Sequence, residues 1–242
     1  MSGAYSAIGG AFEYLNDDCG YEQWSQYLIK KLASLGYGAG AACVDAGCGN
    51  GYFSRALERA GYLVTGVDIS PEMLSEAVRL SRAEGGKTQY ILGDITKLAL
   101  NFRPDFIVAV NDCVNYIPQK KLAAAFKRIY SLLKKGGAFI FDISSENKLK
   151  NVIGNNLFSE DRWDYTYVWF NELFDDRVEM DITLFKRLEN GLYERRDEAQ
   201  TQYIHGETAV LSALEGAGFE AFSEGHLGGS KDERICFYAL KK

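Results

Sequence analysis

A run of alternating glycines is the part of this sequence best suited to hold a small molecule. Gly47, Gly49 and Gly51 follow Asp45, with Cys48 between the first two, and an apolar stretch over residues 42–44 precedes them. A glycine has no Cβ and readily adopts positive φ, so the backbone can turn sharply there and approach a ligand closely. We therefore expect this turn to contact a ligand at the end of a buried strand.

Two carboxylates near this turn indicate what kind of ligand it binds. Asp68 follows the apolar run 63–67, where a carboxylate can accept hydrogen bonds from both hydroxyls of a ribose. Asp45 places a negative charge beside the turn, which would repel a pyrophosphate and attract an ammonium or sulfonium group. In the dinucleotide pattern G-x-G-x-x-G, counted from Gly47, the third glycine position holds Tyr52. The sequence thus predicts a cationic ligand that carries a ribose, and disfavours a nicotinamide dinucleotide.

Two further polar residues end predicted strands. Asp94 follows the strand 89–92, where it could contact the exocyclic amine of an adenine or cap a short helix that begins at Ile95. Asn111 follows the continuous apolar run 106–110, which is typical of the centre of a parallel sheet. Ligands of open α/β sheets bind at the carboxyl ends of strands, where the strand order reverses. We expect Asn111 to line the reaction site.

The elements that position these residues alternate between strand and helix. Apolar spacing of three and four residues predicts helices that begin near Tyr21 and Pro71, helices over 53–60 and 122–133, and another over 207–216. Tyr21 and Trp24, on the first of these, could be core anchors or part of the ligand's wall. Five strand units and a closing hairpin, 219–223 with 235–240, predict a doubly wound α/β fold.

An insert interrupts this alternation after residue 144. Residues 163–170, 178–184 and 192–204 alternate apolar and polar side chains with period two, and Asn190-Gly191 is a strong hairpin signal. We predict a core formed by residues 1–144 and 205–242, and an antiparallel β-meander over 145–204. The meander could be a lid, a homodimer surface or both, and the aromatic residues from Trp163 to Trp169 are expected to pack against the core or a partner subunit.

Composition limits the classes of function. The chain has 242 residues, a net charge of -6 and no basic run, so we expect no nucleic-acid partner. Five cysteines at scattered spacings suggest neither a disulfide framework nor a metal site. No apolar run is long enough to span a bilayer and the first residues do not resemble a signal peptide, so we expect a cytoplasmic protein without membrane contact.

Four motifs together resemble the class I S-adenosylmethionine-dependent methyltransferases. They are the D-x-G-x-G-x-G turn, Asp68, the Gly93-Asp94 pair, and the segment L-L-K-K-G-G-x-F-I-F-D-I-S over 132–144. The resemblance implies a Rossmann-like seven-stranded sheet with an antiparallel last strand, and S-adenosylmethionine as cofactor. More loosely, Tyr5, Phe12, Tyr21, Trp24 and the meander resemble amino-sugar N-methyltransferases and glycine and sarcosine methyltransferases.

The same resemblance implies a role for each site residue. Gly47 and Gly49 would approach the methionine part of the cofactor, with Asp45 near its amino group. Asp68 would hold the ribose, and Asn111 would lie beside the methyl group. The adenine would be bounded by Ile69, Met73, Asp94 and Ile95.

The resemblance predicts methyl transfer to a nitrogen or oxygen of a small-molecule acceptor by direct in-line displacement. Positioning can supply much of the rate, so no covalent enzyme intermediate is needed. No catalytic residue is assigned, and the candidates for a general base are Asp112, Tyr116, His205 and His226, of which His226 is expected on a surface loop. The alternatives are a non-catalytic module that binds the cofactor and docks a partner through the insert, aminopropyl transfer in the same fold, and a nicotinamide oxidoreductase.

Overall fold

The strands predicted for the core pair into one seven-stranded sheet. The computed structural model describes residues 20–242, so Tyr5, Phe12 and Cys19 lie outside the described residues. Strand order is β10-β11-β5-β4-β1-β2-β3. The strands are β1 (Ala42–Ala46), β2 (Leu63–Asp68), β3 (Gln89–Leu92), β4 (Phe106–Ala109), β5 (Ala138–Ser144), β10 (Glu220–Gly225) and β11 (Arg234–Leu240). Because β11 runs antiparallel to both β5 and β10, the Rossmann-like sheet with an antiparallel last strand is confirmed.

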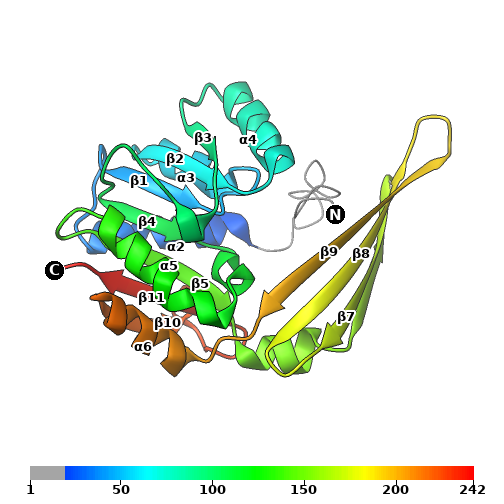
Figure 1. The fold of residues 1–242 in the computed structure, drawn as a ribbon. Helices are drawn as coiled ribbons and strands as arrows, with labels where there is room; N and C mark the ends of the chain where they lie inside the picture. The colour runs from blue at the N-terminus through cyan, green and yellow to red at the C-terminus, as the bar shows by residue number, and fades with distance from the viewer. Residues whose placement is uncertain (1–19) are drawn as a thin grey trace.

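Helices cover both faces of this sheet (Figure 1). Side chains alternate across a strand, so Cys43 of β1 packs with one set of helices and Val44 with the other. The first set includes α2 and α3, and the second includes α5 and α6. The helices are α2 (Tyr21–Ser34), α3 (Tyr52–Arg59), α4 (Pro71–Ala83), α5 (Gln119–Leu132) and α6 (Glu207–Ala217). None of the helices within residues 20–242 is both long and apolar enough to cross a bilayer.

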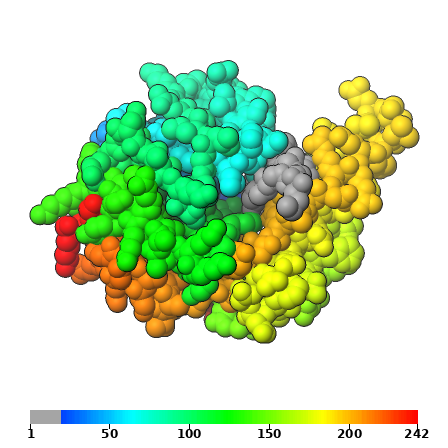
Figure 2. All heavy atoms as spheres, viewed as in Figure 1, coloured from blue at the N-terminus to red at the C-terminus, as the bar shows by residue number. Residues whose placement is uncertain are grey.

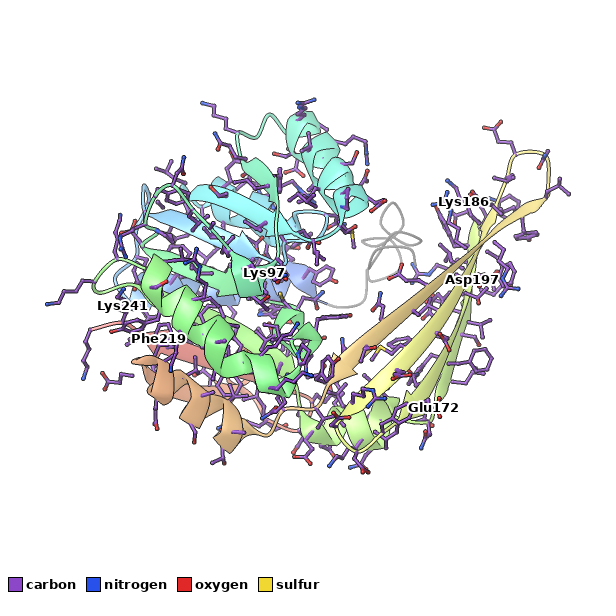
Figure 3. All side chains as sticks on the ribbon, viewed as in Figure 1. Lys97, Glu172, Lys186, Asp197, Phe219 and Lys241 are labelled. Carbon is purple, nitrogen blue, oxygen red and sulfur yellow. The ribbon has the colours of Figure 1, made fainter. Side chains whose placement is uncertain are left out.

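The insert is a four-stranded antiparallel sheet whose far end projects away from the core (Figure 1). Its strands are β6 (Leu157–Asp161), β7 (Tyr165–Leu173), β8 (Arg177–Arg187) and β9 (Tyr193–Tyr203). Figure 2 shows the tip of the β8–β9 hairpin beyond the remaining atoms, and in Figure 3 the labelled Lys186 and Asp197 lie on this outer part. Asn190-Gly191 forms the β8–β9 turn, as the sequence indicated.

Two details of the insert differ from the sequence interpretation. The strand β6 was not predicted, because only two of its residues, Leu157 and Phe158, are apolar. Trp163 was expected to continue the alternation of β7, but it lies between β6 and β7 and is 79% exposed. The alternating aromatic stripe therefore begins at Tyr165.

The near end of the insert is packed against the core. A π-helical turn, η4 (Lys148–Ile153), contributes the buried Leu149, which clusters with the buried Val178 and Met180 of β8. Asn115, which is fully buried after β4, donates from its side-chain nitrogen to the Tyr203 carbonyl at 3.0 Å. These contacts fix one end of the sheet beside the carboxyl ends of the core strands.

Candidate active site

A cavity of about 360 Å³ lies where the carboxyl ends of β1, β2 and β4 meet. This volume falls in the range of pockets that hold small ligands. Every residue that the sequence placed at the ligand lines the cavity except Trp24 and Gly51. These lining residues are Tyr21, Asp45, Gly47, Cys48, Gly49, Asp68, Ile69, Met73, Asp94, Ile95 and Asn111.

The glycine turn has the backbone conformation that its residues require. Gly47 and Gly49 have φ of 73° and 55°, which side chains disfavour. A Cβ on Gly47 would lie 2.3 Å from the sulfur of Cys113, so a larger residue would have to displace the Cys113 side chain and keep a positive φ. The amides of Gly47 and Cys48 donate to the Val67 carbonyl at 2.7 and 3.0 Å, which ties the turn to β2. The turn is therefore a rigid cradle at the floor of the cavity.

Asp68 is held in place by the same turn. Its Oδ2 accepts a hydrogen bond from the Gly49 amide at 2.8 Å, and its Oδ1 accepts one from the Ser70 amide at 2.9 Å. The residue is only 8% exposed, and burial raises the pKa of its carboxyl while the amide contacts oppose that change. Each carboxylate oxygen has a second lone pair, so this geometry leaves acceptor capacity for ligand hydroxyls.

Asp45 is more deeply buried than the sequence suggested. It is 1% exposed, and the Ser54 hydroxyl donates to its Oδ2 at 2.6 Å. Burial raises the pKa of the Asp45 carboxyl to about 7, and nearby Asp68 adds to the shift while the Ser54 contacts oppose it. The negative charge at this position therefore depends on pH in the neutral range, and a cationic ligand would favour the charged form.

An apolar wall and a capping carboxylate bound another side of the cavity. Met73 is buried, whereas Ile69 is 61% exposed although it lines the cavity, which leaves an apolar side chain for a ligand to cover. Asp94 caps the short helix η2 (Ile95–Lys97), since its Oδ1 accepts from the amide and the hydroxyl of Thr96 at 2.8 and 2.7 Å. Asp94 therefore caps this helix, which was one of the two roles considered for it. It also lines the cavity, so capping does not prevent contact with a ligand.

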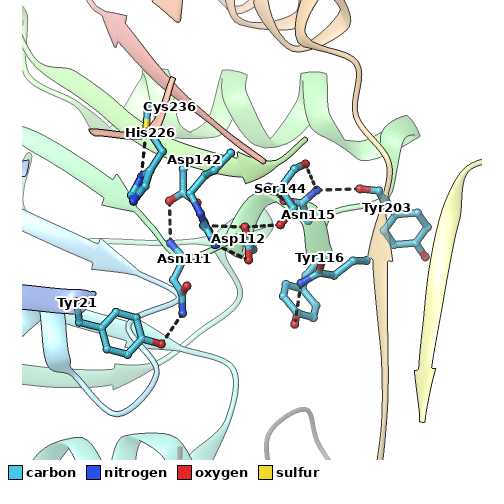
Figure 4. Close-up of polar contacts among 12 residues, drawn as sticks. Tyr21, Asn111, Asp112, Asn115, Tyr116, Asp142, Ser144, Tyr203, His226 and Cys236 are labelled. Carbon is cyan, nitrogen blue, oxygen red and sulfur yellow. Dashed lines mark hydrogen bonds and ion pairs between the residues drawn. The ribbon is translucent and has the colours of Figure 1, made fainter. Parts of the chain in front are cut away.

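Asn111 reaches the cavity from a strained backbone. Asn111 and Asp112, which follow β4 after Val110, have φ of 62° and 64°, a conformation that non-glycine residues seldom adopt. The Asn111 side chain donates to the Tyr21 hydroxyl at 3.2 Å, as drawn in Figure 4. Tyr21, one of the two aromatic residues proposed for the wall, therefore lies next to Asn111 in the cavity lining.

A buried ion network that the sequence did not reveal holds this strained segment. Asp142 of β5 accepts from the amides of Asn111 and Asp112 at 2.7 and 3.1 Å (Figure 4). Arg234 of β11 pairs with Asp142 and also with Asp112, the latter at 2.8 Å. Burial raises the pKa of Asp142 and the Arg234 charge opposes the shift. A charged residue inside the apolar run of β5 was the one signal for this network.

Trp24 and His226 lie behind the site rather than in it. The Trp24 ring packs against Phe53 at 4.9 Å and His226 at 4.7 Å between centroids, and the Arg234 guanidinium lies 4.8 Å from it. His226 was expected on a surface loop, but it is partly buried in this contact, and burial with the nearby Arg234 charge lowers its pKa to about 4. His226 is therefore uncharged at neutral pH.

The remaining candidates for a general base differ in whether they line the cavity. His205 is fully buried, its Nδ1 lies 2.6 Å from Gln119 Oε1, and burial lowers its pKa. It is absent from the cavity lining within the described residues, and so are Asp112 and His226. Tyr116 does line the cavity, and its hydroxyl donates to Gln200 Oε1 of β9 at 2.8 Å.

Comparison with known proteins decides the family. The model of a methyltransferase domain matches residues 43–137. A crystal structure of an S-adenosylmethionine-dependent methyltransferase from Clostridium acetobutylicum is 31% identical, with 96% of each chain covered and a TM-score of 0.87. The chain belongs to the S-adenosylmethionine-dependent methyltransferases. Its cosubstrate is S-adenosylmethionine, and of the functions considered from the sequence, an enzyme that transfers methyl groups is confirmed.

Two further proteins are similar to this methyltransferase, one in sequence and one in fold. A protein of Geobacillus sp. (strain WCH70) that is named as a methyltransferase is 29% identical, with 89% of this chain and 88% of the relative covered. CalS10 of Micromonospora echinaspora, an amino pentose methyltransferase solved with S-adenosylmethionine bound, has a TM-score of 0.75 at 17% identity, with 96% of each chain covered. At that identity the likeness to CalS10 shows the fold alone.

Proposed function

We propose that this methyltransferase acts on a nitrogen or oxygen atom of a small molecule, in the cavity between the glycine turn and the inserted sheet. The observation that carries this proposal is the cavity itself, whose lining joins the cofactor-side residues to Tyr116, which contacts β9. Relatives of the same fold include CalS10, an amino pentose methyltransferase, which supports a small polar acceptor. We propose the division predicted from the sequence, with residues 145–204 as the acceptor-side insert.

The residues present fit S-adenosylmethionine. The proposed roles follow the geometry: the cradle at Gly47 and Gly49 admits close backbone approach, and Asp45 would face the ammonium group. Asp68 has lone pairs for ribose hydroxyls, and the exposed Ile69 would be covered by the adenine. Cys48, Met73, Asp94 and Ile95 complete the proposed cofactor wall.

When bound, S-adenosylmethionine supplies a methyl group on a sulfonium sulfur, which is already a good leaving group. The protein has to align the acceptor and exclude water. Asn111 and Tyr21, joined at 3.2 Å, would bound the reacting region. Tyr116 lines the cavity and is the proposed base if the acceptor must lose a proton.

We propose that the insert also forms a homodimer surface. Leu157 and Phe170 are paired neighbours on the face of the sheet opposite Val178 and Met180, and they are 53% and 54% exposed. Adjacent large apolar side chains on a sheet face are typical of an interaction surface. A second copy of the chain would cover the same residues on both subunits.

The first experiment is a calorimetric titration with S-adenosylmethionine and S-adenosylhomocysteine, with NADH as the control. Saturable binding of the first two ligands is expected, without binding of NADH. Transfer of labelled methyl groups is then measured to a set of small amines and alcohols, and in parallel to ribosomal RNA and protein. Transfer to small molecules supports the proposal, whereas transfer to RNA or protein alone contradicts it.

A further inference from the structure

The side chain of Arg234, at the start of β11, is only 14% exposed. Charged side chains are rarely buried to this extent unless partners compensate the loss of water. The guanidinium has three such partners, the carboxylates of Asp112 and Asp142 and the ring of Trp24. Within residues 20–242, neither Arg234 nor any of these partners lines the cavity. Any effect of Arg234 on the reaction must therefore pass through residues that do line it.

The two carboxylates connect Arg234 to Asn111. Arg234 Nη1 lies 2.8 Å from Asp112 Oδ1, Nη2 donates to Asp112 Oδ2 at 3.1 Å, and Nη1 also pairs with Asp142. Asp142 in turn accepts hydrogen bonds from the amides of Asn111 and Asp112 at 2.7 and 3.1 Å (Figure 4). Both of these amides belong to residues with positive φ, so this backbone needs support to stay in its conformation. The guanidinium supplies support because it fixes both carboxylates at once.

The ring of Trp24 connects Arg234 to Tyr21. The guanidinium carbon lies 4.8 Å from the centroid of the Trp24 ring, within the range of a cation–π contact. Trp24 and Tyr21 are three residues apart on α2 and therefore lie on the same face of this helix. The rings of Trp24 and Tyr21 also pack edge-on against Phe53, with centroid distances of 4.9 and 5.8 Å, respectively. The contact with Trp24 thus helps to set where α2 presents Tyr21.

Asn111 and Tyr21, which these two connections support, contact each other in the cavity lining, where the Asn111 side chain donates to Tyr21 Oη at 3.2 Å. We propose that Arg234 is a positioning residue for methyl transfer, whose guanidinium holds Asn111 and Tyr21 in the arrangement that bounds the transferred methyl group. This inference rests on the proposed function, which places the reacting region at these two residues. A lysine would retain the charge, but its single ammonium cannot reproduce the planar fork that reaches two carboxylates and a ring.

The test observes the methyl group itself, so it does not require the acceptor. S-adenosylmethionine that is isotopically labelled at the methyl carbon is bound to each protein, and the chemical shift of this methyl is measured by NMR. Asn111→Gly defines the shift when the neighbouring side chain is absent. Arg234→Lys is expected to move the signal of the bound methyl toward that of Asn111→Gly. The affinity for S-adenosylmethionine, measured by calorimetry, should change by less than about threefold, since the glycine turn and Asp68 stay intact.

Arg177→Lys is the matched control, because Arg177 has the same kinds of partner but belongs to the insert. It pairs with Asp176 at 3.0 Å and Glu179 at 2.7 Å, and its guanidinium lies 4.3 Å from the centroid of a phenylalanine ring. This substitution should leave the methyl signal unchanged. If Arg234→Lys does not fold, Asp112→Asn decides, because it keeps the size of the side chain and removes the charge of one partner. It should move the signal in the same direction.

The outcomes keep this inference apart from the proposed function. A methyl signal that moves in Asn111→Gly but not in Arg234→Lys or Asp112→Asn refutes the Arg234 role alone. If the melting temperature of Arg234→Lys then falls, the arginine only stabilises the fold, because loss of stability by itself does not move the signal of the bound methyl. An unmoved signal in Asn111→Gly refutes the proposed reacting region and the Arg234 role with it. Absent binding of S-adenosylmethionine to the natural protein refutes the proposed site.

Discussion

At the scale of single residues, Asp68 shows how one side chain serves both the fold and the proposed ligand. Its two oxygens accept from the Gly49 and Ser70 amides, so the carboxylate fixes the turn before any ligand arrives. Removing it altogether would leave two amides without partners, which costs about 1–3 kcal/mol each in a buried site. In an alanine variant, an effect on ligand binding could therefore not be separated from an effect on folding. Asparagine, whose side chain is an amide, is the better substitution.

Asp68→Asn is expected to weaken S-adenosylmethionine binding by about 2 kcal/mol, or roughly thirtyfold, because a charged acceptor for ribose hydroxyls becomes neutral. One oxygen remains to accept an amide, so the melting temperature should fall less than in Asp68→Ala. Calorimetry gives the affinity and thermal denaturation gives the stability. Unchanged affinity in Asp68→Asn would remove this residue from the ribose role.

Asp45 should make cofactor affinity depend on pH. Its pKa of about 7 means that the carboxyl is largely protonated below neutrality, and the protonated form cannot pair with an ammonium. Affinity for S-adenosylmethionine is expected to fall by up to tenfold per pH unit as pH drops from about 7 to 5.5, where the ligand's amine stays protonated. Calorimetry across this range should give a flat profile for Asp45→Asn, and an equal slope in both proteins would contradict the assignment.

Separation along the chain explains which site residues the sequence could predict. The glycines of the turn and Asp68 lie within one strand, turn and helix unit, so their spacing alone places them together. Arg234 meets Asp142 across 92 residues, and Gln202 meets Tyr116 across 86. Such pairs depend on which strands become neighbours, and a single sequence carries no local signal for that.

At the scale of elements, the segment after β4 stores backbone strain at the proposed reaction site. Asn111 and Asp112 both adopt left-handed conformations, and Asp142 and Arg234 hold them there from two other strands. Periodicity predicted the strands themselves, including the exact bounds of β3, because apolar runs and turns are local. It missed β6, whose formation depends on pairing with β7.

Asn111→Gly tests whether this strain serves the reaction. Glycine adopts the same φ without penalty but is more flexible when unfolded, so these effects nearly cancel and stability should change by less than about 1 kcal/mol. The side chain that meets Tyr21 is lost, and kcat for methyl transfer should fall by about tenfold or more while cofactor affinity changes little. Asn155→Gly is a matched control, since Asn155 also has positive φ, at 55°, but lies in the insert. Equal kcat in Asn111→Gly and the natural protein would argue that the residue is structural.

At the scale of the whole molecule, the two sheets have different proposed roles, because one binds the cofactor and the other belongs to the acceptor side. The seven-stranded sheet ends in the cradle for the cofactor, and the four-stranded sheet is fixed beside it by Asn115 and Tyr116. The inner face of the insert buries three polar side chains of β9, whereas its opposite face exposes Leu157 and Phe170. The buried side chains are those of Glu198, Gln200 and Gln202. In the proposed function, assembly would use the exposed face of this sheet and acceptor binding its inner face, so a substitution on one face is expected to change one property without the other.

Phe170→Lys is expected to convert a homodimer into a monomer. A lysine at the centre of an apolar contact has to be desolvated in the dimer, and two copies face each other across a twofold axis. Sedimentation at several protein concentrations measures the mass. Leu63→Lys is the control, because Leu63 is 63% exposed at the start of β2 and lies outside the insert. Cofactor affinity should be unchanged in both variants, since neither residue lines the cavity, and a natural protein that sediments as a monomer would refute the homodimer.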